Sequence, residues 1–241
     1  MDTDKRKAMG GRYPLVSFRI RRTFPRPAAK LIKRYEKFFL CDISDKVGRM
    51  YTMDQTIQPF LRPALPLLGT AVTCKCPPGD NMGVKSALQM TEPGDVLVID
   101  AQGFTEWCLG GFDMLALAIE ERGLKGLVIN GAYRDIAQTK AANFPIYCKG
   151  TAPFSGPKLG PFEINTPVCC GGVIVHPGDL VVASNDEGIV IVPQNYISPV
   201  ADAIDEYGKH VKDKSWGVQR EADRNEYFET LFEERGGIYL D

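Results

Sequence analysis

Five segments in the middle of the chain alternate between two hydrophobic patterns. Short, almost continuous apolar runs at residues 96–100, 127–130 and 144–149 predict buried β-strands. Between them, residues 112–121 and 133–142 repeat apolar side chains at the spacing of a helix. Strands that alternate with helices in this way are joined by right-handed crossovers and lie parallel. The sequence therefore predicts a parallel sheet at the centre of the fold.

The pattern changes after Gly150. Four prolines interrupt residues 151–167, and residues 172–193 then read as three short strands separated by turns that contain Gly and Asp. From residue 195 onward the chain is charged and has helical periodicity. We expect an α/β fold, in which an antiparallel β layer closes the parallel core. The expected parts are a basic N-terminal extension (1–34), an α/β domain (35–194) and a C-terminal helical extension (195–241).

Composition narrows the class of protein. The chain has 241 residues, a formal net charge of -1 and 44% apolar residues, which is typical of globular domains. No apolar run reaches about 18 residues, and the first residues lack the apolar core of a secretory signal. We therefore expect a cytoplasmic protein that does not enter a membrane.

The cysteines and histidines exclude several kinds of site. Seven Cys and two His occur without a CxxC pair or the spacing of a zinc site. We expect reduced, mostly buried thiols. With so few histidines, Ser-His and Cys-His triads are also poor explanations of any activity.

Charge is distributed unevenly between the two ends of the chain. Residues 1–40 hold twelve Lys and Arg against three acidic residues, whereas residues 201–241 hold eleven acidic residues against six basic ones. A basic segment can bind nucleic acid, but such a segment is more often a solvated face or docks on an acidic partner. The acidic tail of a neighbouring subunit would serve as that partner, so nucleic acid is not the partner we expect.

Candidate chemistry gathers where two predicted strands end. One strand end leads through Gly110 and Gly111 into the helix that carries Asp113, and the other leads into Arg134 and Asp135. Because ligands bind beyond the carboxyl ends of parallel strands, we expect these residues to meet in one crevice. The sequence has neither a GxGxxG fingerprint nor a P-loop.

These residue types suit an anionic substrate and a metal ion. Free N–H groups at a helix start and the planar guanidinium of Arg134 can both hold a carboxylate. The carboxylate of Asp135 could hold Mg²⁺, which keeps most of its water and needs few protein ligands. The alternative is that Arg134 and Asp135 cap the second helix and face solvent.

The arrangement resembles a known family. Asp113, twenty further residues and then Arg134-Asp135 within GLVINGAYRD resemble the class II pyruvate aldolases that cleave 4-hydroxy-4-methyl-2-oxoglutarate and 4-carboxy-4-hydroxy-2-oxoadipate. These enzymes share a fold with RraA, the regulator of ribonuclease activity A. Matching stretches also occur at 79–88, 93–100 and 175–193, and the resemblance covers about residues 35–235.

The resemblance implies a swivelling β/β/α domain and a role for each site residue. Asp135 would bind the metal directly, while Asp113 would bind it through water and help to move a proton. Arg134 would hold the pyruvyl group of the substrate together with a four-residue segment. That segment comprises Phe112, Asp113, Met114 and Leu115.

The resemblance also implies partners. The chain would form a homotrimer or a homohexamer with sites between subunits, and a neighbour's C-terminal helix would bring an acidic residue to the metal. Glu221 is the candidate for that residue, and Glu187 and Glu226 compete with it. The metal would be Mg²⁺, with Mn²⁺ or Co²⁺ as alternatives.

The expected function is a divalent-metal-dependent lyase. It would cleave 4-hydroxy-2-oxo acids by a retro-aldol reaction, or decarboxylate oxaloacetate, and release pyruvate through an enolate. The rival is a non-catalytic regulator of a ribonuclease, but regulator-type members need no acid at the position of Asp113. A phosphocarrier-like swivelling domain would need an exposed histidine, whereas His176 lies in a predicted turn.

Overall fold

The computed structural model describes residues 18–184, 187–211 and 214–240. Its main sheet has nine strands, and four central ones run parallel in the order β3-β4-β5-β6. The predicted parallel sheet is thereby confirmed. The strands of this sheet are β1 (Phe18–Ile20), β2 (Gln58–Pro59), β3 (Leu67–Lys75), β4 (Asp95–Asp100), β5 (Gly126–Tyr133), β6 (Ile146–Thr151), β7 (Phe162–Ile164), β10 (Leu180–Ser184) and β11 (Gly188–Val192).

The helices lie on both sides of this sheet and at both ends of the described chain. They are α2 (Ala29–Arg34), α3 (Leu40–Val47), α4 (Met82–Leu88), α5 (Phe112–Glu120), α6 (Ile136–Ala141), α7 (Ile197–Val211) and α8 (Lys214–Glu234). Short 3-10 turns occur at Tyr35–Lys37 (η1), Arg49–Tyr51 (η2) and Gln194–Tyr196 (η3). The helical character predicted from residue 195 onward is confirmed.

β5 is longer than its apolar run indicates. The strand continues to Tyr133 instead of turning at Gly131, so the helix expected over 133–142 begins at Ile136. A register shift between Ile129 and Ala132 lets the ladder to β6 resume beyond Gly131. Because β5 pairs with β6 up to Tyr133, Arg134 and Asp135 lie beyond the end of a longer strand than the sequence predicted.

A second β layer closes the core, as predicted. β10 and β11 form an antiparallel hairpin, and β10 pairs with the first half of β3, while β7 pairs with its end. A separate two-stranded sheet consists of β8 (Val168–Cys170) and β9 (Val173–Val175). The three strands predicted in residues 172–193 are β9, β10 and β11.

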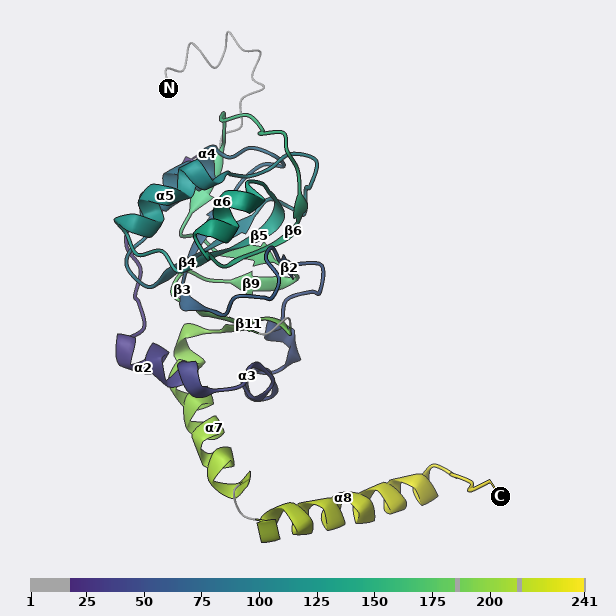
Figure 1. Cartoon of the computed structure of the whole chain (residues 1–241). Coiled ribbons are helices and arrows are strands. Elements are labelled where there is room, and N and C mark those ends of the chain that lie inside the picture. Colours follow the sequence, from purple (N-terminus) through teal and green to yellow (C-terminus); the bar gives the residue numbers. More distant parts are fainter. Residues whose placement is uncertain (1–17, 185–186, 212–213, 241) are drawn as a thin grey trace.

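Three layers of apolar packing follow from this arrangement. One core lies between the parallel sheet and α4 and α5, and a second lies between the sheet and β8–β9 with the β10–β11 hairpin. A third core joins that hairpin to α3 and α7, which lie on the side opposite α4, α5 and α6 (Figure 1). Strands β4 and β5 are buried along their whole length, which explains their continuous apolar runs. These layers match the expected swivelling β/β/α arrangement.

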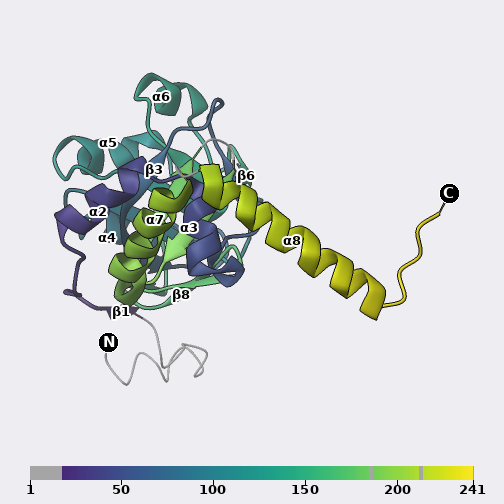
Figure 2. The ribbon, with the colours of Figure 1, turned by 90° about the horizontal axis from the view of Figure 1, so that it is seen from below.

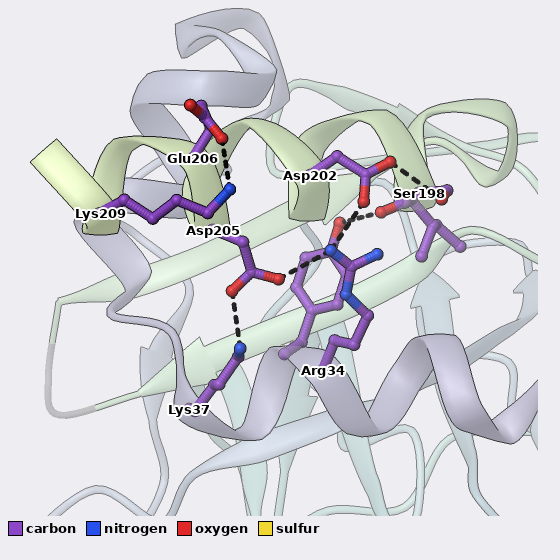
Figure 3. Close-up of polar contacts among 9 residues, drawn as sticks. Arg34, Lys37, Ser198, Asp202, Asp205, Glu206 and Lys209 are labelled. Atoms are coloured by element: carbon purple, nitrogen blue, oxygen red, sulfur yellow. Dashed lines mark hydrogen bonds and ion pairs between the residues drawn. The ribbon is translucent and has the colours of Figure 1, made fainter.

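The N-terminal segment is tied to the far end of the chain. The Arg34 guanidinium contacts Asp202 at 2.7 Å and Asp205 at 2.8 Å, and Lys37 contacts Asp205 at 2.6 Å (Figure 3). The Tyr35 hydroxyl donates to the carbonyl of Ile197 at 2.7 Å. This group of contacts, called here the α2–α7 clamp, fixes α2 and η1 beside α7.

α8 projects away from the body. Two perpendicular views show it extending from the end of α7 on the side opposite α2 (Figures 1 and 2). At its base, Arg220 donates to the Tyr207 hydroxyl of α7 at 2.9 Å. No helix among the described residues is long and apolar enough to cross a membrane.

The seven cysteines are free thiols in the structure. Five of the seven are buried, and Cys41 and Cys169 are exposed.

Candidate active site

The site lies where β5 ends and α5 begins. After Tyr133 the chain turns through Arg134 to Asp135, whose φ of 64° places it in the left-handed region at the start of α6. Such a φ is uncommon for a residue other than glycine, although Asp tolerates it better than most. The turn directs the Asp135 carboxylate back toward the first residues of α5.

Gly111 is the point on which the charged side chains converge. A Cβ atom at this position would lie 3.0 Å from Oδ1 of Asp113 and 3.1 Å from Nε of Arg134, and closer still to Oδ2 of Asp135. The structure thus brings together the three charged residues that the sequence placed at one sheet edge. Because Gly111 carries only a hydrogen atom, the three side chains approach this point more closely than a Cβ would allow.

Asp135 caps α5 rather than its own helix. Its Oδ2 atom accepts the backbone N–H of Phe112 at 2.8 Å, and neither α5 nor α6 has a side-chain cap from its own N-cap residue. A carboxylate at a helix start typically contributes about 0.3–1 kcal/mol. The alternative that Asp135 caps the second helix is therefore wrong for its side chain.

Arg134 has an unused donor inside the site. Its Nη1 atom donates to the carbonyl of Pro153 at 3.2 Å, but Nε is buried and makes no hydrogen bond within the described part of the chain. Oδ1 of Asp135 lies 3.8 Å from Nε, which is an ion-pair distance but too long for a hydrogen bond. Because a buried unpaired donor is costly, this atom is suited to an acceptor brought by a ligand.

Asp113 is free to act on a ligand. It lies on the exposed face of the first turn of α5, and no hydrogen bond or ion pair involves its side chain among the described residues. The carboxylate still approaches the same point at Gly111 as Arg134 and Asp135.

One wall of the site is apolar. The Tyr133 ring packs edge-on against Phe60 with centroids 5.2 Å apart, and Gly110 lies between Tyr133 and the sulfur atom of Met114. Burial raises the pKa of Tyr133 well above its usual value, and the charges of Asp135 and Asp113 add to this effect. Tyr133 therefore remains a neutral phenol.

The segment that begins α5 contributes through its backbone and through some of its side chains. Phe112 is partly buried and offers its N–H to Asp135, whereas Leu115 is 1% exposed and points into the core. The Leu115 side chain therefore cannot contact a ligand directly, although it can support a neighbouring residue that does. The helical spacing of apolar residues in 112–121 had indicated that Leu115 is buried.

Other acidic candidates lie elsewhere in the chain. Glu221 is on α8, exposed, and pairs with Arg224 at 3.0 Å, and Glu226 is exposed on the same helix. Glu187 is exposed beside the turn between β10 and β11. None of the three meets Asp135 within one chain, so a role for Glu221 in a neighbour's site stays a prediction.

Sequence reasoning missed the partners behind the site. The Pro153 carbonyl holds Arg134, and no pattern in the proline-containing loop indicated this contact. At the end of β4, the buried Asp100 carboxylate accepts Asn130 Nδ2 at 3.1 Å and the N–H of Gln102 at 2.9 Å. Asp100 thereby fixes the strand end instead of facing a ligand.

A metal at this site would rest on few protein ligands. The described residues contain no group of three His, Cys, Asp or Glu side chains that could hold an ion. Two carboxylates, Asp135 and Asp113, lie close together beside Gly111. This donor set suits an oxygen-seeking ion that keeps waters or takes substrate oxygens, such as Mg²⁺.

The comparisons with known proteins point to one family. The family model described as RraA-like, Aldolase/RraA, matches residues 40–191. A protein of Halalkalibacterium halodurans is 40% identical over 152 residues, which cover 63% of this chain and 71% of that protein. One of Shewanella oneidensis is 37% identical over 123 residues, covering 51% and 73%. Both carry the name "Putative 4-hydroxy-4-methyl-2-oxoglutarate aldolase".

A solved structure shares the fold. Streptomyces coelicolor RraAS2, described as an unusual member of the RNase ES inhibitor RraA protein family, superimposes with a TM-score of 0.69. It is 27% identical, and the match covers 78% of this chain and 96% of that one. The matched family thus includes proteins named for two different activities.

Proposed function

The chain belongs to the RraA-like family, and we propose that it is a divalent-metal-dependent lyase that breaks a carbon–carbon bond in 2-oxo acids and releases pyruvate. The observation that carries this proposal is the convergence of Asp113, Arg134 and Asp135 on Gly111. An acid, a guanidinium and a second acid grouped beside one glycine can bind a cation and an anionic substrate together. The names of the two aldolase relatives support the same reaction class.

The residues present fit a bound divalent ion. Asp135 would be the direct ligand and Asp113 would bind the ion through water, and both carboxylates lie beside Gly111. When bound, the ion would supply a Lewis acid for the 2-oxo group and its carboxylate. Mg²⁺ is the ion we propose, because it binds through few carboxylates and keeps several waters, and Mn²⁺ or Co²⁺ are the alternatives.

Arg134 would bind the substrate and stabilise the transition state. Its unpaired Nε donor can meet the carboxylate of the 2-oxo acid, and its contact with Pro153 holds the guanidinium plane. Negative charge grows on the 2-oxygen as the bond breaks, and a fixed cation nearby lowers the energy of that state.

Asp113 would move the proton. In retro-aldol cleavage of a 4-hydroxy-2-oxo acid, the C4 hydroxyl loses its proton and the C3–C4 bond breaks. The electron pair passes to the 2-oxo group, giving an enolate, and C3 then takes a proton to yield pyruvate. Loss of CO₂ from oxaloacetate leaves the same enolate. Asp113, which has no partner among the described residues, would orient a bound water that accepts and returns that proton.

A second candidate function rests on the likeness to RraAS2. That protein is named for a family of ribonuclease inhibitors, and an inhibitor acts by contact between proteins. Such a role would need neither the convergence of three charged side chains on Gly111 nor a free Asp113. These features favour the lyase.

The decisive experiment measures pyruvate release. Oxaloacetate and 4-hydroxy-4-methyl-2-oxoglutarate would each be supplied with Mg²⁺ and, separately, with EDTA. Metal-dependent release that Arg134→Ala and Asp135→Ala both abolish supports the lyase. Turnover that survives EDTA or either substitution refutes the assigned site, and inertness toward a wider panel of 2-oxo acids favours the inhibitor.

We propose a cytoplasmic homo-oligomer, a trimer or a hexamer, that acts on a small molecule and not on nucleic acid. Light scattering of the purified protein measures the number of subunits directly.

A further inference from the structure

Three aromatic side chains gather beside the candidate active site. The Trp107 ring packs edge-on against the Phe104 ring, with centroids 5.6 Å apart, and at a tilt against the Phe154 ring, with centroids 5.8 Å apart. We call these three residues the aromatic platform. Phe104 is partly buried, but Trp107 is 38% exposed and Phe154 is 62% exposed. Two of the three rings are therefore accessible to a ligand.

Backbone hydrogen bonds hold the aromatic platform in place. The N–H of Cys108 donates to the carbonyl of Phe154 at 2.8 Å, and the N–H of Leu109 donates to the carbonyl of Ala132 in β5 at 2.9 Å. The segment that carries Trp107 thus lies between the end of β5 and the loop that carries Phe154. A surface that is ordered before a ligand arrives binds at a lower cost in conformational entropy.

Two glycines let Trp107 approach the backbone closely. A Cβ atom at Gly79 would lie 2.6 Å from Cε3 of Trp107 and 3.0 Å from Cε1 of Phe104, and one at Gly156 would lie 3.4 Å from Cε3 of Trp107. Gly79 also has a φ of 74°, which favours glycine. The indole is therefore supported by packing on one side, and its exposed part is left for a ligand.

The aromatic platform adjoins the arginine that we assign to substrate binding. Pro153, whose carbonyl accepts Nη1 of Arg134 at 3.2 Å, directly precedes Phe154. Because consecutive Cα atoms lie about 3.8 Å apart, the platform begins one residue from this contact. The unpaired Nε atom belongs to the same guanidinium group. A ligand whose carboxylate is held by Nε therefore has the platform within reach of its other end.

The charge around the aromatic platform disfavours a second carboxylate at that other end. The two segments that form the platform, residues 104–109 and 152–155, contain one charged side chain, Glu106. Glu106 is exposed and adjoins Trp107 in the chain. A distal carboxylate would meet an acid and no cation of these segments, whereas an uncharged aromatic group would gain burial and ring stacking.

We propose that the aromatic platform binds the part of the substrate that leaves as an aldehyde, so that the substrates are 4-hydroxy-2-oxo acids with an aromatic group at C4. This inference rests on the proposed lyase function. In the cleavage, the C4 hydroxyl loses its proton, the C3–C4 bond breaks and C4 leaves as an aromatic aldehyde. The electron pair forms the enolate, which takes a proton at C3 and leaves as pyruvate. Trp107 and Phe154 then determine specificity and do not touch the reacting atoms.

Two ligands that differ by one ring test the contact without turnover. 2-Oxo-4-phenylbutanoate and 2-oxobutanoate both lack the C4 hydroxyl that the cleavage needs, and the first alone carries a phenyl group. With the full-length protein and Mg²⁺, we expect calorimetry to give at least tenfold tighter binding of the phenyl compound. Phe154→Ala should remove most of that difference. Phe39→Ala, at a residue that precedes α3 and is 72% exposed, is the matched control and should keep it. Equal affinity of the wild type for both ligands overturns the proposal.

Turnover separates this proposal from the lyase itself. Pyruvate release from 4-hydroxy-2-oxo-4-phenylbutanoate and from 4-hydroxy-4-methyl-2-oxoglutarate would be compared as kcat/KM. We expect the wild type to prefer the phenyl substrate at least tenfold and Phe154→Ala to lower that ratio. Release from the dicarboxylate alone, or an unchanged ratio in Phe154→Ala, overturns the platform and leaves the lyase standing. Release from neither compound also overturns the platform, and the wider panel of 2-oxo acids then decides the lyase.

A contact between copies of the chain is the rival use of these exposed rings. Mass photometry of Phe154→Ala distinguishes the two. A protein that changes its number of subunits but keeps the wild-type preference for the phenyl ligand assigns the rings to such a contact and overturns the proposal. Trp107→Leu is the second variant, because it keeps an apolar side chain on Gly79 while removing the indole. It should lower the preference for the phenyl ligand as Phe154→Ala does, and a preference equal to that of the wild type counts against the platform.

Discussion

The Asp135 carboxylate accepts the backbone N–H of Phe112 at 2.8 Å, so one side chain connects the end of β5 to the start of α5. The same carboxylate borders the space at Gly111. Asp135 therefore has a structural role that is separable from its proposed role as a metal ligand. Two substitutions at this position should separate them.

Asp135→Asn keeps an acceptor for Phe112 but removes the charge. We expect its melting temperature to stay near that of the wild type and its rate of pyruvate release to fall by about 10²-fold or more. Asp135→Ala loses the cap as well and should cost a further 0.5–2 kcal/mol or so of stability. Thermal unfolding and a coupled pyruvate assay measure the two effects. An active Asp135→Asn protein would remove this residue from the chemistry.

Gly111→Ala should block the site without unfolding the protein. Gly111 has φ -132° and ψ 172°, which any residue adopts, so alanine adds no backbone strain. Its Cβ would displace the side chains of Asp113, Arg134 and Asp135. We expect loss of Mg²⁺ binding by calorimetry and of activity.

Gly208→Ala is the control for that substitution. A Cβ at this helical position in α7 meets nothing within 4 Å. It should leave activity intact and stabilise the protein by about 0.5–1 kcal/mol. Equal loss of activity in both variants would argue against a special role for Gly111.

Arg134→Lys should be inactive although the charge is kept. Lysine cannot present the planar fork of a guanidinium, so both the contact with Pro153 and the free Nε donor are lost. We expect a large rise in KM for the 2-oxo acid together with a fall in kcat. Arg122→Lys, beyond the end of α5, should behave as the wild type. A fully active Arg134→Lys enzyme would mean that a point charge is enough.

The α2–α7 clamp should weaken in acid. Hydrogen bonds from Lys37, and then from Arg34, hold the pKa of the Asp205 carboxyl below its usual value of 3.8. A lowered pKa adds stability above the unfolded-state value, and this stability is lost as the pH falls through the lowered value. The free energy of unfolding of the wild type minus that of Asp205→Asn should be constant at neutral pH and shrink below pH 3.8.

Denaturant titrations at several pH values measure this difference, and Asp45→Asn at an exposed position of α3 serves as control. The effect should also shrink in high salt, because the clamp lies near the surface. If the free energy of unfolding of the wild type minus that of Asp205→Asn grew as the pH fell, the expected direction of the effect would be wrong.

Local patterns were enough to predict the central sheet and the neighbourhood of the site. Continuous apolar runs predict β4 and β5, and the rule that ligands bind at the carboxyl ends of strands placed Asp113 near Arg134 and Asp135. The end of β5 could not be predicted, because Tyr133 stays in the strand through its pairing with Thr151. The cap from Asp135 to Phe112 and the inward direction of Leu115 depend on the same three-dimensional pairing.

β1 lies parallel to β7, with Phe18 opposite Phe162 and Ile20 opposite Ile164. During synthesis on the ribosome, β1 is therefore made about 140 residues before the strand it joins, and it must remain unpaired for that time. Arg19 lies within this strand, and Arg21 and Arg22 follow it directly. Charges at and beside a short apolar strand act as gatekeepers against aggregation. We therefore expect the basic residues at this point to keep the nascent segment from aggregating until β7 has been made.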